Sequence, residues 1–411
     1  MLDTQSLLGF ARVLYAFLSY LSTFTLFLIL SWTIYHTPIV LAAILSRKRE
    51  DEPPRKEDAP KISVIVPVKD DARVAERALH SILLQDYPRD KIEVIIVDGS
   101  REEVSGKVRS ILGGFPMSVK YVREEKPNGK PSALNRALPY ATGQVIAVLD
   151  ADNMLDREAF KNAVKYFADP RVKAVQGVID SLNEKDSAWT KVASKEEMLW
   201  NRVLLRGRSK LGLFTPLSGS CFFVSSEALR KVGGFPNTLA EDLDLSLMLV
   251  KQGYWIVYAE DVRGMWETPR TLRALVVQRR RWYRGYMESL LRNWRIVRPS
   301  RKLVDAEIVM AGPILLVLSF LTIIWWLAIN VLGFPRLDGG VSAYIVTSLN
   351  FFSIFTVGAA LSFGEKPRRL ANIAWIPLVY AYWLVMMAVA FYAFLLVLFR
   401  RPARWERTPK Y

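Results

Sequence analysis

Residues 144–152 read QVIAVLDAD, a short apolar run that stops at Asp150-Ala151-Asp152. Runs of this length between turn residues are typical of buried strands. Two similar runs precede it: ISVIVPV at Ile62–Val68, and EVIIV at residues 93–97, which is followed by Asp98-Gly99-Ser100. Helix-length segments separate the runs, which indicates βαβ units. We therefore expect an α/β domain whose mainly parallel sheet is covered on both faces.

The aspartates at the ends of these runs are the first candidates for a functional site. In open sheets of this kind, ligands bind outside the carboxyl ends of the strands. Asp98 and the later aspartate pair both follow a predicted strand, so we expect them to lie at the same edge of the sheet. A carboxylate at such a position can also be a helix cap or a turn residue. For Asp98 alone, that alternative stays open.

The composition places part of the chain in a membrane. The chain has 411 residues, is 51% hydrophobic and carries a formal net charge of +16. Its apolar residues concentrate at residues 7–45 and 308–399. Residues 14–35 carry no charge and are long enough to cross a bilayer, which takes about 20 apolar residues. The core of a signal peptide would be shorter. The basic stop at Arg47-Lys48-Arg49 places the domain that follows in the cytoplasm.

Three more candidate spans follow, at residues 308–332, Val341–Phe363 and residues 371–399. The first connection carries one basic residue and the second carries three, which fits one span going out and the next returning. A third crossing would leave the tail outside, although residues 400–410 are strongly basic. Three explanations stay open: the tail is an exception, the last span does not cross once, or the N-terminal segment forms a hairpin. We expect four spans.

Asp150 and Asp152 are suited to hold one hard divalent cation. The chain has one cysteine and two histidines, which excludes a cysteine-rich zinc site and leaves carboxylates as metal ligands. Carboxylates prefer Mg²⁺ or Mn²⁺, and such an ion would stabilise a nucleoside diphosphate as a leaving group. Lys130 starts a helix-length segment, where a cation and a helix N-terminus together suit phosphate. The alternative for Lys130 is an exposed surface lysine.

Two further segments carry candidate chemistry. Glu241 and Asp242 follow a Gly-Gly-Phe-Pro turn and open a helical period, so they are either dipole partners or a general base. Gln278, Arg281 and Trp282 lie in a basic, aromatic stretch over residues 268–298. The stretch as a whole is typical of an amphipathic interfacial helix. These three side chains could still face a site, where they would hydrogen-bond a sugar, hold a diphosphate and stack on a pyranose ring.

Taken in order, these motifs closely resemble the membrane-bound family 2 glycosyltransferases, which include cellulose, chitin, hyaluronan and poly-N-acetylglucosamine synthases. The matching positions are Val66-Pro67, Asp98-Gly99-Ser100, Lys130 with Ala133-Leu134-Asn135, Asp150-Ala151-Asp152, Ser218-Gly219-Ser220, Glu241-Asp242 and Gln278-x-x-Arg281-Trp282. The segment Arg404-Trp405-Glu406-Arg407-Thr408 resembles the end of the poly-N-acetylglucosamine branch. The resemblance implies a GT-A (Rossmann-like) domain on the cytoplasmic side of the cell membrane, with transmembrane and interfacial helices.

The resemblance also implies roles for these residues. Those implied for donor binding are Asp98 and Asp71 at the uridine, Lys130 and Asp150 at the diphosphate, and Gln278 and Arg281 closing the site. Asp152 would ligate the metal, and Asp242 would be the catalytic base with Glu241 beside it. The residues implied near the acceptor are Trp282, Ser218, Gly219 and Cys221. Cys221 is otherwise a small buried residue.

Two departures from the family's pattern concern the acceptor and regulation. Many of these synthases carry threonine before the Glu-Asp pair, where this chain has Ala240, so its acceptor pocket is expected to differ. The chain also lacks the accessory regions of cellulose synthases and a cyclic-dinucleotide-binding domain, so we do not expect regulation of that type.

We expect an inverting transferase that adds sugar from UDP-N-acetylglucosamine or UDP-glucose to a growing polysaccharide. The alternative is transfer of one sugar to a lipid, as in glucosylceramide synthases or onto a polyprenyl phosphate. A non-catalytic membrane scaffold is a more remote alternative, and nucleic acid is not an expected partner. The predicted divisions are an anchor (1–49), a linker (50–60), the GT-A domain (61–267), interfacial helices (268–304), a membrane region of about three spans (305–400) and a basic tail (401–411).

Overall fold

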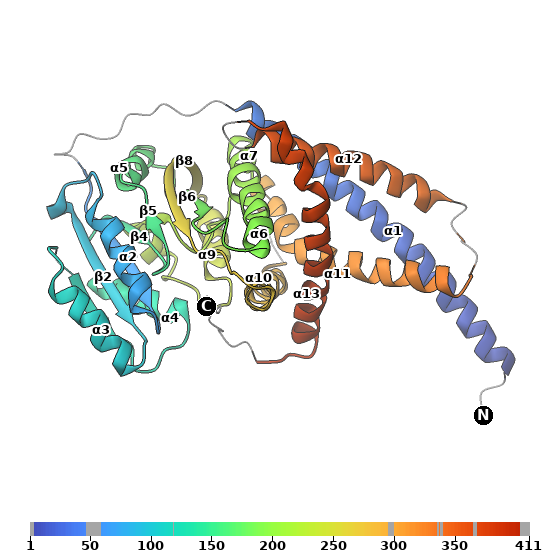
Figure 1. Cartoon of the computed structure of the whole chain (residues 1–411), viewed down its shortest axis with the longest axis horizontal. Helices are drawn as coiled ribbons and strands as arrows, with labels where there is room; N and C mark the ends of the chain where they lie inside the picture. The colour runs from blue at the N-terminus through green and yellow to red at the C-terminus, as the bar shows by residue number, and fades with distance from the viewer. Residues whose placement is uncertain are drawn as a thin grey trace.

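The computed structural model describes residues 4–46, 59–117, 119–294, 300–334, 337, 340–364 and 368–402. An α/β domain forms one end of the molecule, and long apolar helices extend from it (Figure 1). The predicted linker falls almost entirely outside the described residues, as do the tail beyond residue 402 and its Arg404–Thr408 segment.

The α/β domain is built on one mixed, mostly parallel sheet with the strand order β3-β2-β1-β4-β7-β6-β8-β5. The strands are β1 Ile62–Val68, β2 Ile92–Asp98, β3 Val119–Arg123, β4 Val145–Val148, β5 Met154–Leu155, β6 Val172–Ser181, β7 Phe222–Ser225 and β8 Trp255–Trp266. Strands β1 to β4 are parallel, which confirms the prediction for the first half of the sheet. The second half differs, because β7 runs antiparallel to both β4 and β6.

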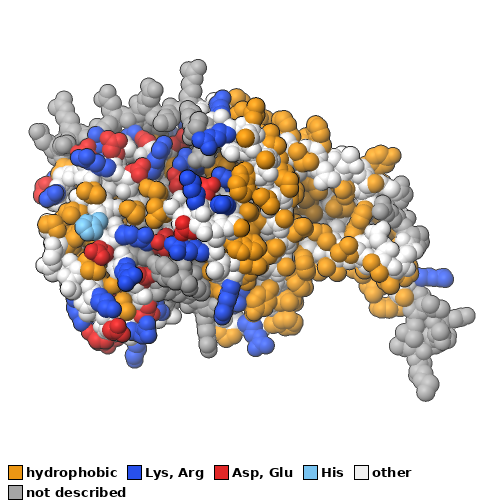
Figure 2. All heavy atoms as spheres, viewed as in Figure 1, with side chains coloured by type: hydrophobic (Ala, Val, Ile, Leu, Met, Phe, Trp, Pro, Cys, Tyr) orange, Lys and Arg blue, Asp and Glu red, His pale blue; other side chains and the backbone are white. Residues whose placement is uncertain are grey.

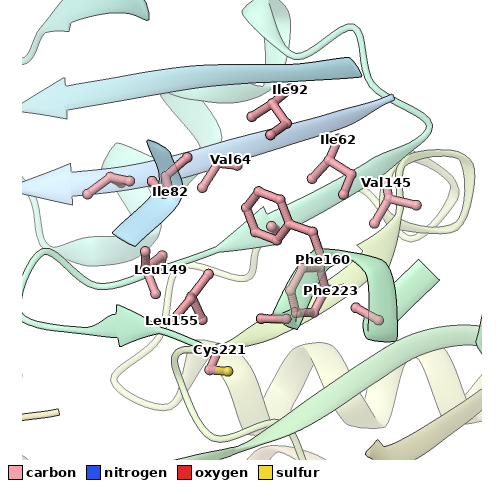
Figure 3. Packing of buried hydrophobic residues seen from close by; sticks show 14 of the residues in the cluster. Ile62, Val64, Ile82, Ile92, Val145, Leu149, Leu155, Phe160, Cys221 and Phe223 are labelled. Atoms are coloured by element: carbon pink, nitrogen blue, oxygen red, sulfur yellow. The ribbon is translucent and has the colours of Figure 1, made fainter. Parts of the chain in front are cut away.

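Helices cover both faces of the sheet, as expected. The helices of this domain and the segment after it are α2 Ala72–Leu83, α3 Glu102–Gly113, α4 Lys130–Ala137, α5 Ala159–Val164, α6 Ala188–Met198, α7 Leu205–Lys210, α8 Ser226–Lys231, α9 Glu241–Lys251 and α10 Leu272–Asn293. A π-helical turn, Leu199–Leu204, joins α6 to α7. One core cluster packs α2 and α5 on the sheet, where Ile82 and Phe160 lie over Val64 (Figure 3). The other packs α4 and α9 on the opposite face.

Four described helices are long and apolar enough to cross a membrane, as predicted. They are α1 Thr4–Leu45, α11 Arg301–Val331, α12 Val341–Phe363 and α13 Ile376–Leu398, the last preceded by the short helix Leu370–Trp375. Helix α11 begins before the predicted residue 308, because Leu303, Ala306 and Met310 are buried against α9. Hydrophobic side chains cover the surface of these helices, whereas charged side chains cover the α/β domain (Figure 2).

Candidate active site

Lys130 is the centre of the candidate site. It is the first residue of α4, and its ammonium lies 2.7 Å from Oδ1 of Asp150 and 3.5 Å from Oε1 of Glu241. It also donates a hydrogen bond of 2.5 Å to the carbonyl oxygen of Gly219. Burial alone would lower the pKa of Lys130, but the carboxylates of Asp150 and Glu241 raise it. A charged lysine thus joins three of the motifs singled out in the sequence.

The turn before β7 places the second acidic motif beside this lysine. Gly219 has φ of +76°, a left-handed conformation that favours glycine. A Cβ at Gly219 would lie 3.4 Å from Oδ2 of Asp242 and 3.6 Å from Nζ of Lys130. Because no side chain fills that space, the Asp242 carboxylate and the Lys130 ammonium approach the same point of the backbone.

Gln176, which sequence reasoning missed, holds this turn. It lies on the buried strand β6 and accepts a hydrogen bond from the backbone N–H of Ser218 at 2.8 Å. Its amide donates to the carbonyl of Ser220 at 3.1 Å. The Ser220 hydroxyl in turn accepts from the N–H of Asp150 at 2.9 Å. The acidic turn after β4 and the glycine turn are therefore fixed to one another. Gln176 interrupts the apolar stretch from Ala174 to Ile179, and this interruption was the available signal.

Asp242 has the electrostatics of a base that works near neutral pH. Burial raises its pKa to about 7, and the Glu241 carboxylate contributes to the rise. Three interactions lower the pKa of Asp242 and so oppose this rise: the charge of Lys130, a hydrogen bond from the N–H of Leu243 and the charge of Arg281. A carboxyl group with this pKa is about half ionised at pH 7, and its ionised form can accept a proton from a hydroxyl.

Helix α10 packs against the start of α9, and the charge of Arg281 on this helix acts on Asp242. A Cβ at Gly285 would lie only 3.0 Å from Cβ of Ala240, the residue before Glu241. Arg281 and Trp282, one turn earlier on α10, are therefore close to the start of α9. The Trp282 ring lies 6.1 Å from the ring of Trp266.

Arg279, also missed from the sequence, supports this segment. Its side chain is buried, and its guanidinium lies 4.1 Å from the centre of the Trp282 ring. It donates to Oε1 of Gln278 at 2.8 Å and forms ion pairs with Glu196 at 2.8 Å and Glu197 at 3.2 Å. The run of three arginines in the sequence gave no sign of which one is buried.

Asp98 is enclosed rather than open to the site. Its carboxylate is fully buried and accepts hydrogen bonds from the N–H of Ser100 at 2.8 Å and the hydroxyl of Tyr121 at 2.9 Å. Burial alone would raise its pKa, but interactions with the side chains of Ser100 and Ser105, together with these two hydrogen bonds, lower it below the usual value. Asp98 therefore shapes the loop after β2. Asp71 lies directly before α2, and the uridine contacts of both residues stay predictions.

The side chain of Cys221, a residue predicted to lie near the acceptor, points into the core of the sheet, and a place near the acceptor stays a prediction. The thiol is buried in the core cluster of the sheet (Figure 3), and burial raises its pKa. A Cβ at Gly177 or at Gly264 would lie 2.7 Å or 3.1 Å from its sulfur, so the thiol fills the space that two glycines leave. The alternative, a small buried residue, is what the structure shows. Gly219, in contrast, borders the space beside Lys130, and the acceptor roles of Ser218 and Gly219 stay predictions.

A divalent cation at the carboxylates after β4 stays a prediction. Within the described residues, no group of three or more His, Cys, Asp or Glu side chains could hold a metal ion. Asp150 and Asp152 can supply at most two carboxylates, which is the usual protein contribution to a magnesium site completed by phosphate oxygens and water.

Residues 60–285 match the family model described as Glycosyltransferase like family 2. Among curated proteins, the chain is 27% identical over 240 residues to a probable glycosyltransferase, YdaM, of Bacillus subtilis, covering 57% of each chain. It is 28% identical over 264 residues to the beta-monoglucosyldiacylglycerol synthase of Trichormus variabilis, covering 64% of this chain and 56% of that one. The chain thus spans little more than half the length of these two relatives.

A longer match is to the poly-beta-1,6-N-acetyl-D-glucosamine synthase of Staphylococcus epidermidis, 27% identical over 352 residues, covering 81% of this chain and 82% of that one. Among solved structures, the mannosyltransferase PcManGT of Pyrobaculum calidifontis, in complex with GDP-Man and Mn²⁺, has a TM-score of 0.68 at 23% identity. That likeness covers 94% of this chain and 100% of the other, and it shows that the two chains share a fold.

Proposed function

The chain belongs to glycosyltransferase family 2, and on that premise we propose that it transfers a sugar from a nucleotide-sugar donor with inversion, using Asp242 as the base. The observation that carries the proposal is the meeting of Lys130, Asp150 and Glu241 within 3.5 Å, next to the Asp242 carboxylate. The Lys130 ammonium lies between two acidic motifs. A site of this kind is suited to bind a diphosphate on one side and an acceptor hydroxyl on the other.

In the proposed reaction, Asp242 takes the proton of an acceptor hydroxyl as its oxygen attacks the anomeric carbon of the sugar. The bond between that carbon and the diphosphate oxygen breaks on the opposite face, so a single displacement inverts the configuration. Lys130 stabilises the charge that develops on the departing diphosphate. Burial of these groups strengthens the interaction, since little water screens it.

Asp150 and Asp152 would hold a divalent cation, Mg²⁺ or Mn²⁺, which would neutralise charge on the diphosphate. The Mn²⁺ in the mannosyltransferase that shares this fold supports the proposal. Arg281 would approach the same diphosphate, and Gln278 and Trp282 would close over the sugar. The contacts that hold Trp282 in place support a fixed rather than a mobile wall.

The names of the relatives support two classes of acceptor. The long match to a poly-N-acetylglucosamine synthase favours a growing polysaccharide, with UDP-N-acetylglucosamine as donor. The matches to monoglucosyldiacylglycerol synthases favour a lipid that receives one glucose. We further propose that the α/β domain lies on the cytoplasmic face of the cell membrane, because Arg47-Lys48-Arg49 follows the first apolar helix.

The test is to incubate the purified protein with a panel of UDP- and GDP-sugars plus Mg²⁺ or Mn²⁺, and to measure nucleotide release and product size. Release with one donor and a ladder of products would support the polysaccharide synthase. Release that requires added lipid, with one sugar incorporated, would support the glycolipid synthase. No release with any donor, with or without lipid, would contradict both.

A further inference from the structure

Helix α13 does not run in the same direction as the other three apolar helices. Helices α1, α11 and α12 extend together away from the α/β domain, and α1 packs against both of the others (Figure 1). Helix α13 runs across their direction, at the border between the charged and the apolar parts of the surface (Figures 1 and 2). Its main neighbours are α10, α11 and α6. Two of these, α6 and α10, are held by the α/β domain.

The first turns of α13 contact the α/β domain. Val379 is buried in a cluster with Met198 and Val203, from the α6–α7 segment, and with Val40 near the end of α1. Just before α13, the ring of Trp375 lies 5.7 Å from the ammonium of Lys195 on α6.

The middle of α13 contacts helices α6 and α10. The Tyr382 hydroxyl donates to Glu196 of α6 at 2.9 Å. Met386 lies in a buried cluster with Ala193 of α6 and Leu275 of α10. One turn later, Ala390 packs with Met287 of α10.

The end of α13 also returns to α10. Arg284 donates hydrogen bonds to the backbone carbonyls of Arg401 and Pro402, the latter at 3.2 Å. The next residue of α10, Gly285, is the one that packs against Ala240 at the start of α9. The chain that leaves α13 is therefore at the level of the candidate active site.

These contacts conflict with a simple crossing. Helix α13 has 23 residues and is about 35 Å long at 1.5 Å per residue, slightly more than the hydrocarbon core of a bilayer, which is about 30 Å thick. If it crossed like α12, one end would lie on the far side of the membrane, out of reach of Arg284. Instead, contacts with the α/β domain and α10 continue from Val379 to Pro402.

We propose that α13 lies along the leaflet on the side of the α/β domain, so that three helices cross the membrane and residue 402 stays on the side of that domain. Its partner surface is the lipid of one leaflet, into which the exposed side chains of Leu378, Leu384 and Leu398 would insert. The proposal also removes the conflict seen in the sequence, because the basic tail then lies on the same side as Arg47-Lys48-Arg49. It goes beyond the proposed reaction and does not depend on it.

Depth measurements test the proposal directly. Single cysteines at Leu378, Leu384 and Leu398 would carry a fluorophore in the full chain, reconstituted in vesicles that contain lipids with a quencher near the headgroup or near the chain end. Phe351, exposed in the middle of α12, is the control for a crossing helix. We expect all three α13 positions to be quenched by the shallow lipid and Phe351 by the deep one. A Leu384 probe as deep as Phe351 would overturn the proposal.

The side of the membrane is tested with a membrane-impermeant maleimide. Cysteines at Arg400, at Glu227 on α8 and at Leu332 after α11 would be compared in intact and permeabilised cells; all three positions are exposed. The native Cys221 is buried, and the unsubstituted protein serves as the blank. We expect Arg400→Cys to react under the same condition as Glu227→Cys, and Leu332→Cys under the opposite one. If the maleimide instead labels Arg400→Cys under the same condition as Leu332→Cys, α13 crosses the membrane and the proposal is overturned.

Discussion

The ammonium of Lys130 lies 2.7 Å from Oδ1 of Asp150 and thereby links the start of α4 to the acidic turn after β4. Both groups are part of the candidate site, and Lys130 is nearly fully buried. A donor diphosphate that enters this space adds negative charge where a positive charge is already fixed. In the proposed reaction, Lys130 would therefore bind the leaving group without a change of position.

Replacing Lys130 with methionine should weaken donor binding about tenfold to a hundredfold, because one charge-assisted contact is lost. Calorimetric titration with the nucleotide diphosphate measures the effect. Lys126→Met, in the exposed segment before α4, is the matched control and should bind like the wild type. Equal affinities of the two variants would remove Lys130 from the donor site.

Asp152→Asn should raise the concentration of Mn²⁺ or Mg²⁺ needed for half-maximal nucleotide binding by about tenfold or more, since a metal ligand is lost. Chelation of the metal should lower the affinity of the wild type toward that of the variant. The exposed Asp90→Asn is the control for the change of charge. A metal dependence unchanged in Asp152→Asn would count against its assignment as a ligand.

The pKa of Asp242, raised by burial to about 7, predicts a pH profile. A base acts when it is deprotonated, so kcat should fall about tenfold for each pH unit below 7 and level off above it.

The free energy of unfolding should change with pH in the opposite direction to kcat. Because the folded-state pKa of Asp242 exceeds the unfolded value of about 3.9, its stabilising contribution is lost as the pH rises through 7. Asp242→Asn should therefore melt above the wild type at pH 8 and close to it near pH 4. A rate independent of pH between 5 and 8 would contradict this assignment.

Arg279→Lys should lower kcat while the protein stays folded. Lysine keeps the charge that faces Glu196 and Glu197 but loses the planar group that stacks on Trp282. Rates, tryptophan fluorescence and melting temperature should be compared with those of Arg273→Lys, at an exposed position of the same helix. A fall in melting temperature with no change in fluorescence or kcat would make Arg279 purely structural.

The sequence predicted the first half of the sheet because β1, β2 and β4 are apolar runs that end in polar turns. It did not predict β7, whose four residues run antiparallel between β4 and β6. A run that short has no periodicity of its own, and only its neighbours determine its direction. The same holds for Asp98, since no local pattern shows whether a carboxylate after a strand is open or enclosed.

The candidate site was predicted as a set of motifs but not as a network. Lys130, Asp150 and Asp242 each had a local signal, namely a helix start or a strand end. Gln176 and Arg279 act through groups distant in the sequence, so only the fold reveals them. Helix α13 is a similar case, because composition identifies an apolar helix while tertiary contacts indicate its direction.

The central claim is that Asp242 is the base, and Asp242→Asn tests it most directly. The variant changes one oxygen to nitrogen and removes the proton acceptor beside Lys130. Transfer and nucleotide affinity should be measured on the same preparation. We predict that transfer falls by about a hundredfold to ten-thousandfold while the affinity for the nucleotide diphosphate stays within a few-fold of the wild type. Loss of binding together with transfer, or transfer at the wild-type rate, would contradict the account.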